Sequence, residues 1–432
     1  MFTLETQELS QKIGAIHPIR HCRICGSDRL RSVLTLGEMA MTGIFPRDVK
    51  EAVTIGPLEL VKCEEDASGL TCGLLQLGHN FDRNEMYGLN YGYRSGLNAS
   101  MMRHLQGVVA EIQQRIALLP KDLIVDIGSN DGTMLSMYPD NLDRVGIDPT
   151  GIKFAHYYPP SVQLIPQFFS SEDFHKEFGD RKARVITSIA MFYDLPAPLE
   201  FMREIRACLA DDGLWVIEMS YMPLMLERLA YDTVCHEHLE YYGLRQLQWM
   251  AQRAGFKILS AVCNDANGGS LRLFMTPNEN NTAKCDDTVG ILWDREHACG
   301  LSDIKPYQMF AQRIQQHRDE LRALITRVTH GGNLVLGYGA STKGNVLIQY
   351  CGLTPQEIPA IVDVNEDKYG CFTPGSHIPI ISEQDAKNID FGYFLVFPWH
   401  FREFILKKEI LFLQNGGKLI MPLPKLEIIS LV

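Results

Sequence analysis

The sequence predicts an α/β protein with two separate parallel sheets and a small cysteine-bearing lobe ahead of them. Short apolar segments alternate with helical stretches from about residue 121 onward and again after residue 330, which is the pattern of repeated βαβ units. Ahead of both regions, residues 20–76 hold four of the eleven cysteines and show little helical periodicity. Three domains are expected, at residues 1–80, 81–279 and 280–432.

Hydrophobic periodicity predicts the individual elements in chain order. Apolar residues recur every three or four positions from Met101 to Ile116, which predicts a helix ahead of the first sheet. A second, long amphipathic helix is expected at about residues 303–328, between the two sheets. The first sheet should contain strands at 123–128, 144–148, 184–190 and 214–219. The second should contain strands at 333–339, 358–364, 393–397 and 418–423.

The composition is that of a soluble globular protein, with 46% hydrophobic and 22% charged residues. The formal net charge of −11 disfavours broad binding to the phosphate backbone of nucleic acids. No segment reaches the ~18 apolar residues of a membrane span, so no membrane partner is expected. The first residues, MFTLETQELSQK, lack the apolar core of a secretory signal. A cytoplasmic location with reduced cysteines is therefore predicted.

The cysteines of the first lobe have the spacing of a metal site. HCRICGS supplies Cys22 and Cys25 as a CxxC pair, and Cys63 and Cys72 follow with eight residues between them. Four thiolates can complete a tetrahedral zinc site, which has no open position for catalysis. We therefore predict a structural Zn²⁺. The alternative is one CxxC pair with two unrelated buried thiols.

A first glycine-rich turn, LIVDIGSNDGTML, follows an apolar strand and precedes a helical pattern. Its glycines allow a ligand to approach the backbone at the carboxyl end of the strand. Asp148 ends the next strand, where a carboxylate can accept hydrogen bonds from ribose hydroxyls. This combination resembles the class I S-adenosyl-L-methionine (SAM) methyltransferase pattern. A Rossmann-like domain for another nucleotide, or for none, is the alternative.

A second glycine-rich turn, GYGASTKGN, has the same strand–turn–helix order at residues 337–345. Ser341, Thr342 and Lys343 lie at the predicted helix start, where free amides, the helix dipole and the lysine charge favour an anion. A phosphate or diphosphate is the natural ligand. A simple helix cap with a solvated lysine is the alternative.

The segment DTVCHEHLEYYGL at residues 232–244 concentrates titratable groups. On an extended backbone, His236 and His238 would lie on one side and Glu237 on the other. The histidines could bind a metal or make structural hydrogen bonds. Proton transfer is favoured, because the ordinary pKa of histidine near 6.5 suits a base at neutral pH.

At this point the chain resembles the SAM-dependent sugar C-methyltransferases that act on nucleotide-linked 4-keto deoxysugars. The resemblance spans nearly the whole chain. Its motifs, in order, are CRICGS with a later cysteine pair and GLLQL, YGYRSG, DIGSNDGT, IEMSYMP leading to DTVCHEHLEYY, NGGSLRLF, GYGASTKGN, VDVNEDKYGCFTPGSHIPI and FPWHF. One departure is Cys235, because the residue before HEH is often tyrosine in members from antibiotic pathways.

The resemblance implies a zinc-binding N-terminal lobe, a central class I SAM-methyltransferase Rossmann-like domain and a C-terminal pseudo-Rossmann α/β domain, with the nucleotide sugar between the last two. It implies that His238 removes the proton at C3, next to the C4 ketone. Glu237 and His236 would support this catalytic base or contact the sugar, and Tyr93 would lie in the catalytic site near the sugar. SAM would contact Asp126, Gly128, Asn130, Asp131, Gly132 and Asp148. The sugar nucleotide would contact Ser270, Arg272, Ser341, Thr342, Lys343 and Asn345.

Three other functions remain open at this stage. An O- or N-methyltransferase with the same cofactor is the nearest alternative, because it needs a base but no adjacent carbonyl. A zinc-ribbon nucleic-acid methyltransferase is disfavoured by the acidic charge. A binding module without catalysis is disfavoured because all three polar motifs are present. The sequence leaves open whether the protein is a monomer or a homodimer.

Overall fold

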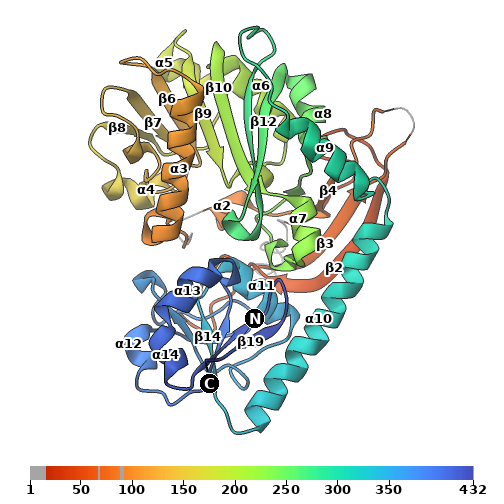
Figure 1. Cartoon of the computed structure of the whole chain (residues 1–432), viewed down its shortest axis with the longest axis vertical. Coiled ribbons are helices and arrows are strands. Elements are labelled where there is room, and N and C mark those ends of the chain that lie inside the picture. Colours follow the sequence, from red (N-terminus) through yellow and green to blue (C-terminus); the bar gives the residue numbers. More distant parts are fainter. Residues whose placement is uncertain (1–15, 67–68, 88–91, 432) are drawn as a thin grey trace, which may run out of the picture.

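The computed structural model describes residues 16–66, 69–87 and 92–431, which form three lobes. The central lobe occupies the upper half of Figure 1 and the C-terminal lobe the lower half, with the N-terminal sheet between them at one side. The first residues, MFTLETQELSQK, which the sequence analysis compared with a secretory signal, lie outside the described residues. The α/β prediction is confirmed.

The central lobe contains a seven-stranded sheet in the order β12-β13-β10-β9-β6-β7-β8. The strands from β6 to β10 pair in parallel, and β13 is antiparallel to both of its neighbours. The four strands predicted from the sequence are therefore confirmed. The strands are β6 (Leu123–Ile127), β7 (Asp143–Ile147), β8 (Val162–Ile165), β9 (Ala183–Ile189), β10 (Leu209–Ser220), β12 (Phe256–Asn264) and β13 (Ser270–Pro277).

Helices cover this sheet. The predicted first helix is confirmed as α3, and its apolar residues are buried. The helices of the central lobe are α3 (Ala99–Arg115), α4 (Gly151–Phe154), α5 (Ser171–Phe178), α6 (Pro198–Cys208), α7 (Met222–Arg228) and α8 (Leu244–Ala254), and α9 (Thr288–Ala298) packs against α8 and β12.

The C-terminal lobe contains a six-stranded sheet in the order β16-β15-β14-β17-β18-β19. All pairs are parallel except β18 with β19, so the second predicted parallel sheet is confirmed. Its strands are β14 (Val335–Tyr338), β15 (Ile361–Asp363), β16 (Ile380–Ser382), β17 (Tyr393–Val396), β18 (Lys418–Met421) and β19 (Glu427–Ile429). Its helices are α11 (Thr342–Tyr350), α12 (Glu383–Ala386), α13 (Arg402–Lys408) and α14 (Ile410–Gln414).

The N-terminal lobe is an antiparallel sheet in the order β11-β4-β3-β2. Its strands β2 (Leu30–Ala40), β3 (Ile55–Cys63) and β4 (Leu75–Leu77) come from the start of the chain, but β11 (Glu240–Tyr241) comes from the middle. A short pair, β1 (His17–Pro18) with β5 (His79–Asn80), and helix α2 (Arg83–Met86) complete it. A segment of the central lobe thus closes the N-terminal sheet.

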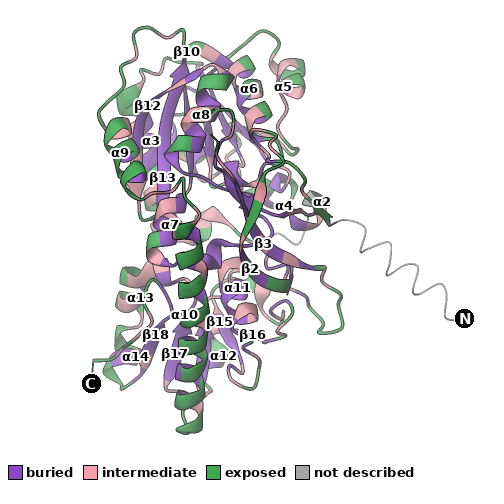
Figure 2. Cartoon of the chain, turned by 90° about the vertical axis from the view of Figure 1, so that its right-hand side faces the viewer, coloured by how far each residue is buried: buried purple, intermediate pink, exposed green. Residues whose placement is uncertain are grey.

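The predicted long helix is confirmed as α10 (Lys305–His330), which runs along one side of the molecule from the central to the C-terminal lobe (Figure 1). It buries Phe310, Ile314, Leu321 and Ile325 on one face, while the opposite face is exposed (Figure 2). Contacts with β2, α7 and β14 connect it to all three lobes. Among the described helices, none has both the length and the apolarity that a bilayer crossing requires.

Candidate active site

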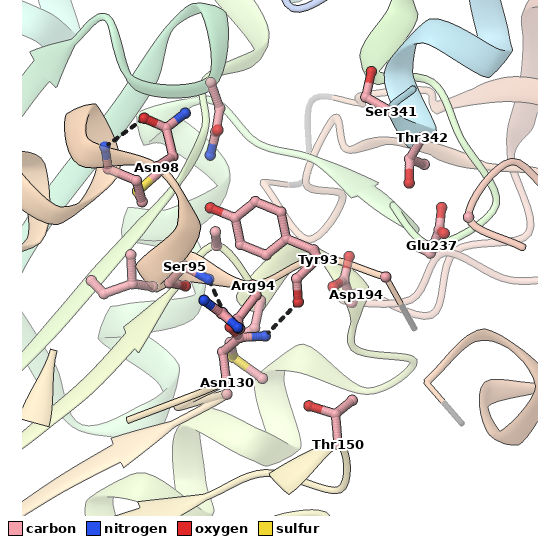
Figure 3. A pocket seen from close by; sticks show the side chains of 18 of the residues that line it. Tyr93, Arg94, Ser95, Asn98, Asn130, Thr150, Asp194, Glu237, Ser341 and Thr342 are labelled. Atoms are coloured by element: carbon pink, nitrogen blue, oxygen red, sulfur yellow. Dashed lines mark hydrogen bonds between the residues drawn. The ribbon is translucent and has the colours of Figure 1, made fainter. Parts of the chain in front are cut away.

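A cavity of about 660 Å³ lies between the carboxyl ends of the two parallel sheets. Residues 126–130 and 147–150 line it from the ends of β6 and β7, and residues 338–343 and 362–365 line it from the ends of β14 and β15. Open α/β sheets bind ligands at this end of their strands. In Figure 3, Asn130 and Thr150 lie across the cavity from Ser341 and Thr342. The two glycine-rich turns, one from each sheet, therefore line the same cavity and could both bind ligands there.

The turn after β6 and the end of β7 place Asp126, Gly128, Asn130 and Asp148 on the cavity. The Asp126 carboxylate accepts a hydrogen bond from Thr187 Oγ1 at 2.6 Å, and burial raises the pKa of Asp126 to about 7. Asp148 accepts hydrogen bonds from the backbone N–H of Asn130 at 2.8 Å, and burial raises its pKa as well. Two buried carboxylates beside a glycine turn suit a ligand with cationic groups and hydroxyls.

The side chains of Asn130 and Asp131 bind the polar link at residues 92–98. Asn130 donates to the carbonyl of Tyr93 at 3.1 Å and accepts from the Ser95 N–H at 2.9 Å (Figure 3). Asp131 accepts from the Gly96 N–H at 2.9 Å and lies away from the cavity wall.

Gly132 also lies away from the cavity wall. A Cβ there would lie 2.9 Å from the Tyr158 ring, and its φ is +73°. The structure therefore gives Gly132 a role in the shape of the turn. The link itself places Tyr93 on the cavity.

The expectation of an extended HEH segment is wrong, because residues 235–238 form a tight turn, here called the HEH turn. Its backbone closes with a 3.2 Å hydrogen bond from the His238 N–H to the Cys235 carbonyl. As a result, Glu237 and His238 line the cavity together. His236 is instead fully buried on the other side, edge-on to Phe81, and burial lowers its pKa to about 4.

His238 has one ring nitrogen engaged by the backbone. Nδ1 lies 2.7 Å from the carbonyl oxygen of Thr233, and the ring packs edge-on against Tyr193 with centroids 4.3 Å apart. Burial, and secondly the charge of Lys343, lowers the pKa of His238 to about 3, so the imidazole is neutral. A neutral ring with Nδ1–H donating leaves Nε2 as a proton acceptor.

The pKa of Glu237 is shifted in the opposite direction to that of His238. Burial raises the pKa of its carboxyl group, which favours the protonated form. Its Oε2 atom has no hydrogen-bond partner among the described residues. A Cβ on Gly43 would lie 2.1 Å from Oε1, so this position must be glycine for the carboxyl group to keep its place.

The second glycine-rich turn places Ser341, Thr342 and Lys343 on the cavity. Ser341 caps α11 by accepting from the Gly344 N–H at 3.0 Å, and Lys343 Nζ donates to the carbonyl of Asn267 at 2.5 Å. Asn345 is buried away from the cavity, where it donates to the Thr42 carbonyl at 2.7 Å. It therefore connects α11 to the N-terminal lobe.

Two predicted substrate residues lie behind the cavity wall. Ser270 Oγ donates to the carbonyl of Ala266 at 2.9 Å. Arg272 pairs with Glu218 at 2.8 Å and with Glu111 at 2.6 Å, and of these residues only Glu218 lines the cavity. The structure thus places Ser270 and Arg272 in a supporting layer. The residues that it brings together on the cavity are Asp126, Gly128, Asn130, Asp148, Glu237 and His238.

Two titratable residues that line the cavity, Lys368 and His400, are among those that the sequence analysis did not predict. Lys368 donates from Nζ to the Ala340 carbonyl at 2.7 Å, and burial lowers its pKa. His400 lines the cavity near Lys343, and burial lowers its pKa as well. Both lie in the segments that follow strands β15 and β17, so the carboxyl-end rule could have identified them.

The four predicted cysteines form one cluster outside the cavity wall. Their sulfur atoms all lie within 4.8 Å of one another, with Cys22–Cys72 at 3.4 Å and Cys25–Cys63 at 3.5 Å. Zn–S bonds of about 2.3 Å in a tetrahedron require S···S distances of about 3.8 Å, so the donor set fits zinc. No disulfide links any cysteine in the described part of the chain. The predicted structural zinc site is confirmed.

Comparisons with known proteins match this architecture. Family models match in three successive segments: a zinc binding domain at residues 22–87, a methyltransferase domain at 101–261 and a C-methyltransferase C-terminal domain at 265–424. The C-methyltransferase NovU from Streptomyces niveus is 31% identical over 420 residues, covering 96% of this chain and 98% of NovU.

Solved structures show partial similarity to the chain. A SAM-dependent methyltransferase from Clostridium acetobutylicum is 10% identical, with a TM-score of 0.32, covering 41% of this chain and 92% of that one. The plantazolicin methyltransferase BpumL in complex with SAH is 13% identical, with a TM-score of 0.33, covering 40% of this chain and 82% of that one. These similarities are too distant to inform the function.

The shared sequence extends over all three lobes, and the cavity and cysteine cluster lie within the matched segments. The enzyme is a SAM-dependent methyltransferase, with SAM and a structural zinc as its cofactors. The chain belongs to the SAM-dependent sugar C-methyltransferase family.

Proposed function

We propose that this C-methyltransferase acts on a nucleotide-linked 4-keto-6-deoxysugar by enolate formation. The observation that carries the proposal is the position of His238, on the same cavity as both glycine-rich turns and with Nδ1 engaged by the Thr233 carbonyl. An orientated neutral imidazole has a lone pair on Nε2 that can accept a proton from a carbon acid. The turn after β6 would bind SAM, which supplies an electrophilic methyl group.

His238 Nε2 would take the proton from C3 of the sugar, and the electron pair left behind would become the enolate of the C4 ketone. SAM, held by the turn after β6 and the end of β7, would supply the methyl group to the enolate carbon, with the methyl–sulfur bonding pair staying on sulfur. Glu237 would donate a hydrogen bond to the ketone oxygen, because burial favours its protonated form. A donor at the developing oxyanion stabilises the transition state.

The C-terminal side of the cavity supports a diphosphate. Lys343 and Lys368 both line it, and each ammonium group donates to a backbone carbonyl, of Asn267 and Ala340 respectively. Neither has a carboxylate within 4.0 Å among the described residues. Two cations beside the N-terminus of α11 favour an anionic group. A reducing compartment such as the cytoplasm suits the four thiolates of the zinc site.

The test is incubation of the enzyme with a 4-keto sugar nucleotide in deuterated water, with and without SAM. We expect deuterium at the carbon next to the ketone without SAM and a carbon-linked methyl group with SAM. His238→Gln should lose both signals, whereas His330→Gln, at an exposed position, should keep them. A methyl group on oxygen or nitrogen, or no exchange with any ketosugar, would overturn the enolate mechanism.

A further inference from the structure

Arg23 stands between two zinc-ligating cysteines, and its side chain is buried against the central lobe. The side chain is 3% exposed. Nη1 donates to the carbonyl oxygens of Leu77 at 2.6 Å and Leu239 at 3.3 Å, and Nη2 donates to Asn80 Oδ1 at 2.7 Å. One of these acceptors, Leu239, directly follows the HEH turn. The metal-binding backbone is therefore linked to the neighbour of the catalytic base.

A buried ion pair strengthens this link. Arg23 Nε lies 3.6 Å from Glu240 Oε1, and the Glu240 side chain is fully buried. Neither carboxylate oxygen of Glu240 has a hydrogen-bond partner among the described residues. Burial raises the pKa of Glu240 well above its ordinary value and the charge of Arg23 opposes that rise, so loss of Arg23 would leave the carboxyl group buried without its cation. Arg23 therefore holds the Glu240 side chain, while pairing with β4 holds its backbone in β11.

Leu239 directly follows His238 in the chain, and both its N–H and its carbonyl group are hydrogen-bonded. Its N–H donates to the Tyr193 carbonyl at 2.8 Å, and its own carbonyl accepts from the Leu77 N–H at 2.8 Å as well as from Arg23. Tyr193 is also the residue whose ring packs against the imidazole of His238. A shift of Leu239 would therefore move the base and the ring that packs against it together.

The second half of the cysteine cluster has its own connection to the central lobe. Gln246 in α8 donates from Nε2 to the carbonyl of Cys72 at 3.0 Å. The cluster is thus attached on both sides, and Arg23 adds side-chain contacts to the segment next to the HEH turn, which also pairs with β4.

We infer that Arg23 is a positioning residue: through Leu239 and Glu240 it fixes the HEH turn, so the zinc lobe sets the geometry of proton transfer as well as its own stability. The inference rests on the proposed function for the role of His238. Loss of Arg23 should misplace the imidazole without removing any group that contacts SAM or the sugar. Misplacement of about 1 Å can cost roughly 100-fold in rate.

The test compares Arg23→Lys with Arg29→Lys, an exposed matched control in the same lobe. Lysine keeps the charge but presents its three N–H groups from one nitrogen, so it cannot reproduce the planar fork that spans Leu77, Leu239 and Asn80. We expect kcat to fall roughly 10- to 100-fold in Arg23→Lys with KM and SAM affinity little changed. The zinc content should stay at about one per chain. The ¹⁵N signals of His238, assigned with His238→Gln in histidine-labelled enzyme, should shift.

Glu240→Gln provides a second variant in case Arg23→Lys fails to fold, and it should show the same kcat loss and the same shift of His238. Wild-type kcat with unshifted His238 signals in the folded variant would overturn the inference. If the wild-type enzyme itself exchanges no proton on any ketosugar, the proposed function fails. The His238 signals then still decide whether Arg23 positions the turn.

Discussion

The Nδ1 atom of His238 lies 2.7 Å from the carbonyl oxygen of Thr233. Because a carbonyl only accepts, Nδ1 carries the proton and Nε2 is the basic atom. Burial lowers the pKa of His238 to about 3, so the ring stays neutral throughout the range in which most enzymes work. The tautomer and the charge state are thus both set before substrate binds.

His238→Ala should lower kcat by roughly 100- to 10,000-fold, the usual contribution of a general base. Added imidazole should restore part of the rate by occupying the vacated space beside Thr233. The measurement is product formation against imidazole concentration, with His330→Ala as the exposed control. A variant that retains full activity without imidazole would exclude His238 as the base.

SAM affinity should weaken as the pH falls through 7. Burial raises the pKa of Asp126 to about 7, so its carboxylate becomes protonated below that value and loses its attraction for the cationic ligand. Calorimetric titration with SAM between pH 6 and 8 measures the effect. Asp126→Asn should bind SAM weakly at every pH in this range. An equally steep pH dependence in that variant would assign the effect to another group.

Acid should destabilise the fold partly through His236. Its folded-state pKa is about 4 and the unfolded value is about 6.5, so the unfolded chain binds more protons between these limits. The stabilisation is fully present above pH 6.5 and is lost as the pH falls toward 4. Between pH 7 and 5 this single group should cost about 2 kcal/mol of unfolding free energy. Denaturant titrations should show a smaller loss in His236→Gln, and an unchanged loss in His330→Gln.

The metal should depend on the cysteines and not on the histidines. Elemental analysis should find about one zinc per chain in the wild-type protein and in His238→Ala. Cys22→Ser should lose the metal and unfold at a lower temperature, because zinc binding contributes to folding. Cys285→Ser, at an exposed position, is the matched control. Loss of zinc from His238→Ala would place the metal at the HEH turn.

Lys368→Met should raise KM for the sugar nucleotide roughly 10- to 100-fold, because a charge-assisted hydrogen bond to phosphate is lost. SAM affinity should not change, because Lys368 lies on the C-terminal side of the cavity. Steady-state kinetics with Lys387→Met as the exposed control separates the two effects. An unchanged KM would mean that the diphosphate binds elsewhere.

The structural features that depend on local sequence pattern were predicted correctly. Both parallel sheets, the helices α3 and α10 and the cysteine cluster follow from periodicity and ligand spacing. The HEH turn was not predicted from the sequence. A hydrogen bond from the His238 N–H to the Cys235 carbonyl closes a turn where an extended segment was expected. Spacing alone cannot show whether a side chain faces a ligand or its own chain. For this reason the sequence did not reveal that the Asn130 side chain, on the cavity wall, also binds the link.

Long-range contacts were the least predictable part. Lys368 reaches the cavity because β15 lies beside β14, and no local pattern reveals that neighbour. Arg23 meets Leu239 for the same kind of reason, since a strand from the middle of the chain completes the N-terminal sheet.

The pairing of β11 with β4 also has a consequence for the order of events during synthesis. When residues 75–77 leave the ribosome, the strand that will cover their outer edge has not yet been made. Until residue 241 emerges, β4 exposes unpaired amides and carbonyls that could pair with another chain. Metal capture by the cysteines can occur early, but the sheet can close only after most of the central lobe exists. A fragment ending at residue 87 would therefore contain all four cysteines and still have an open edge.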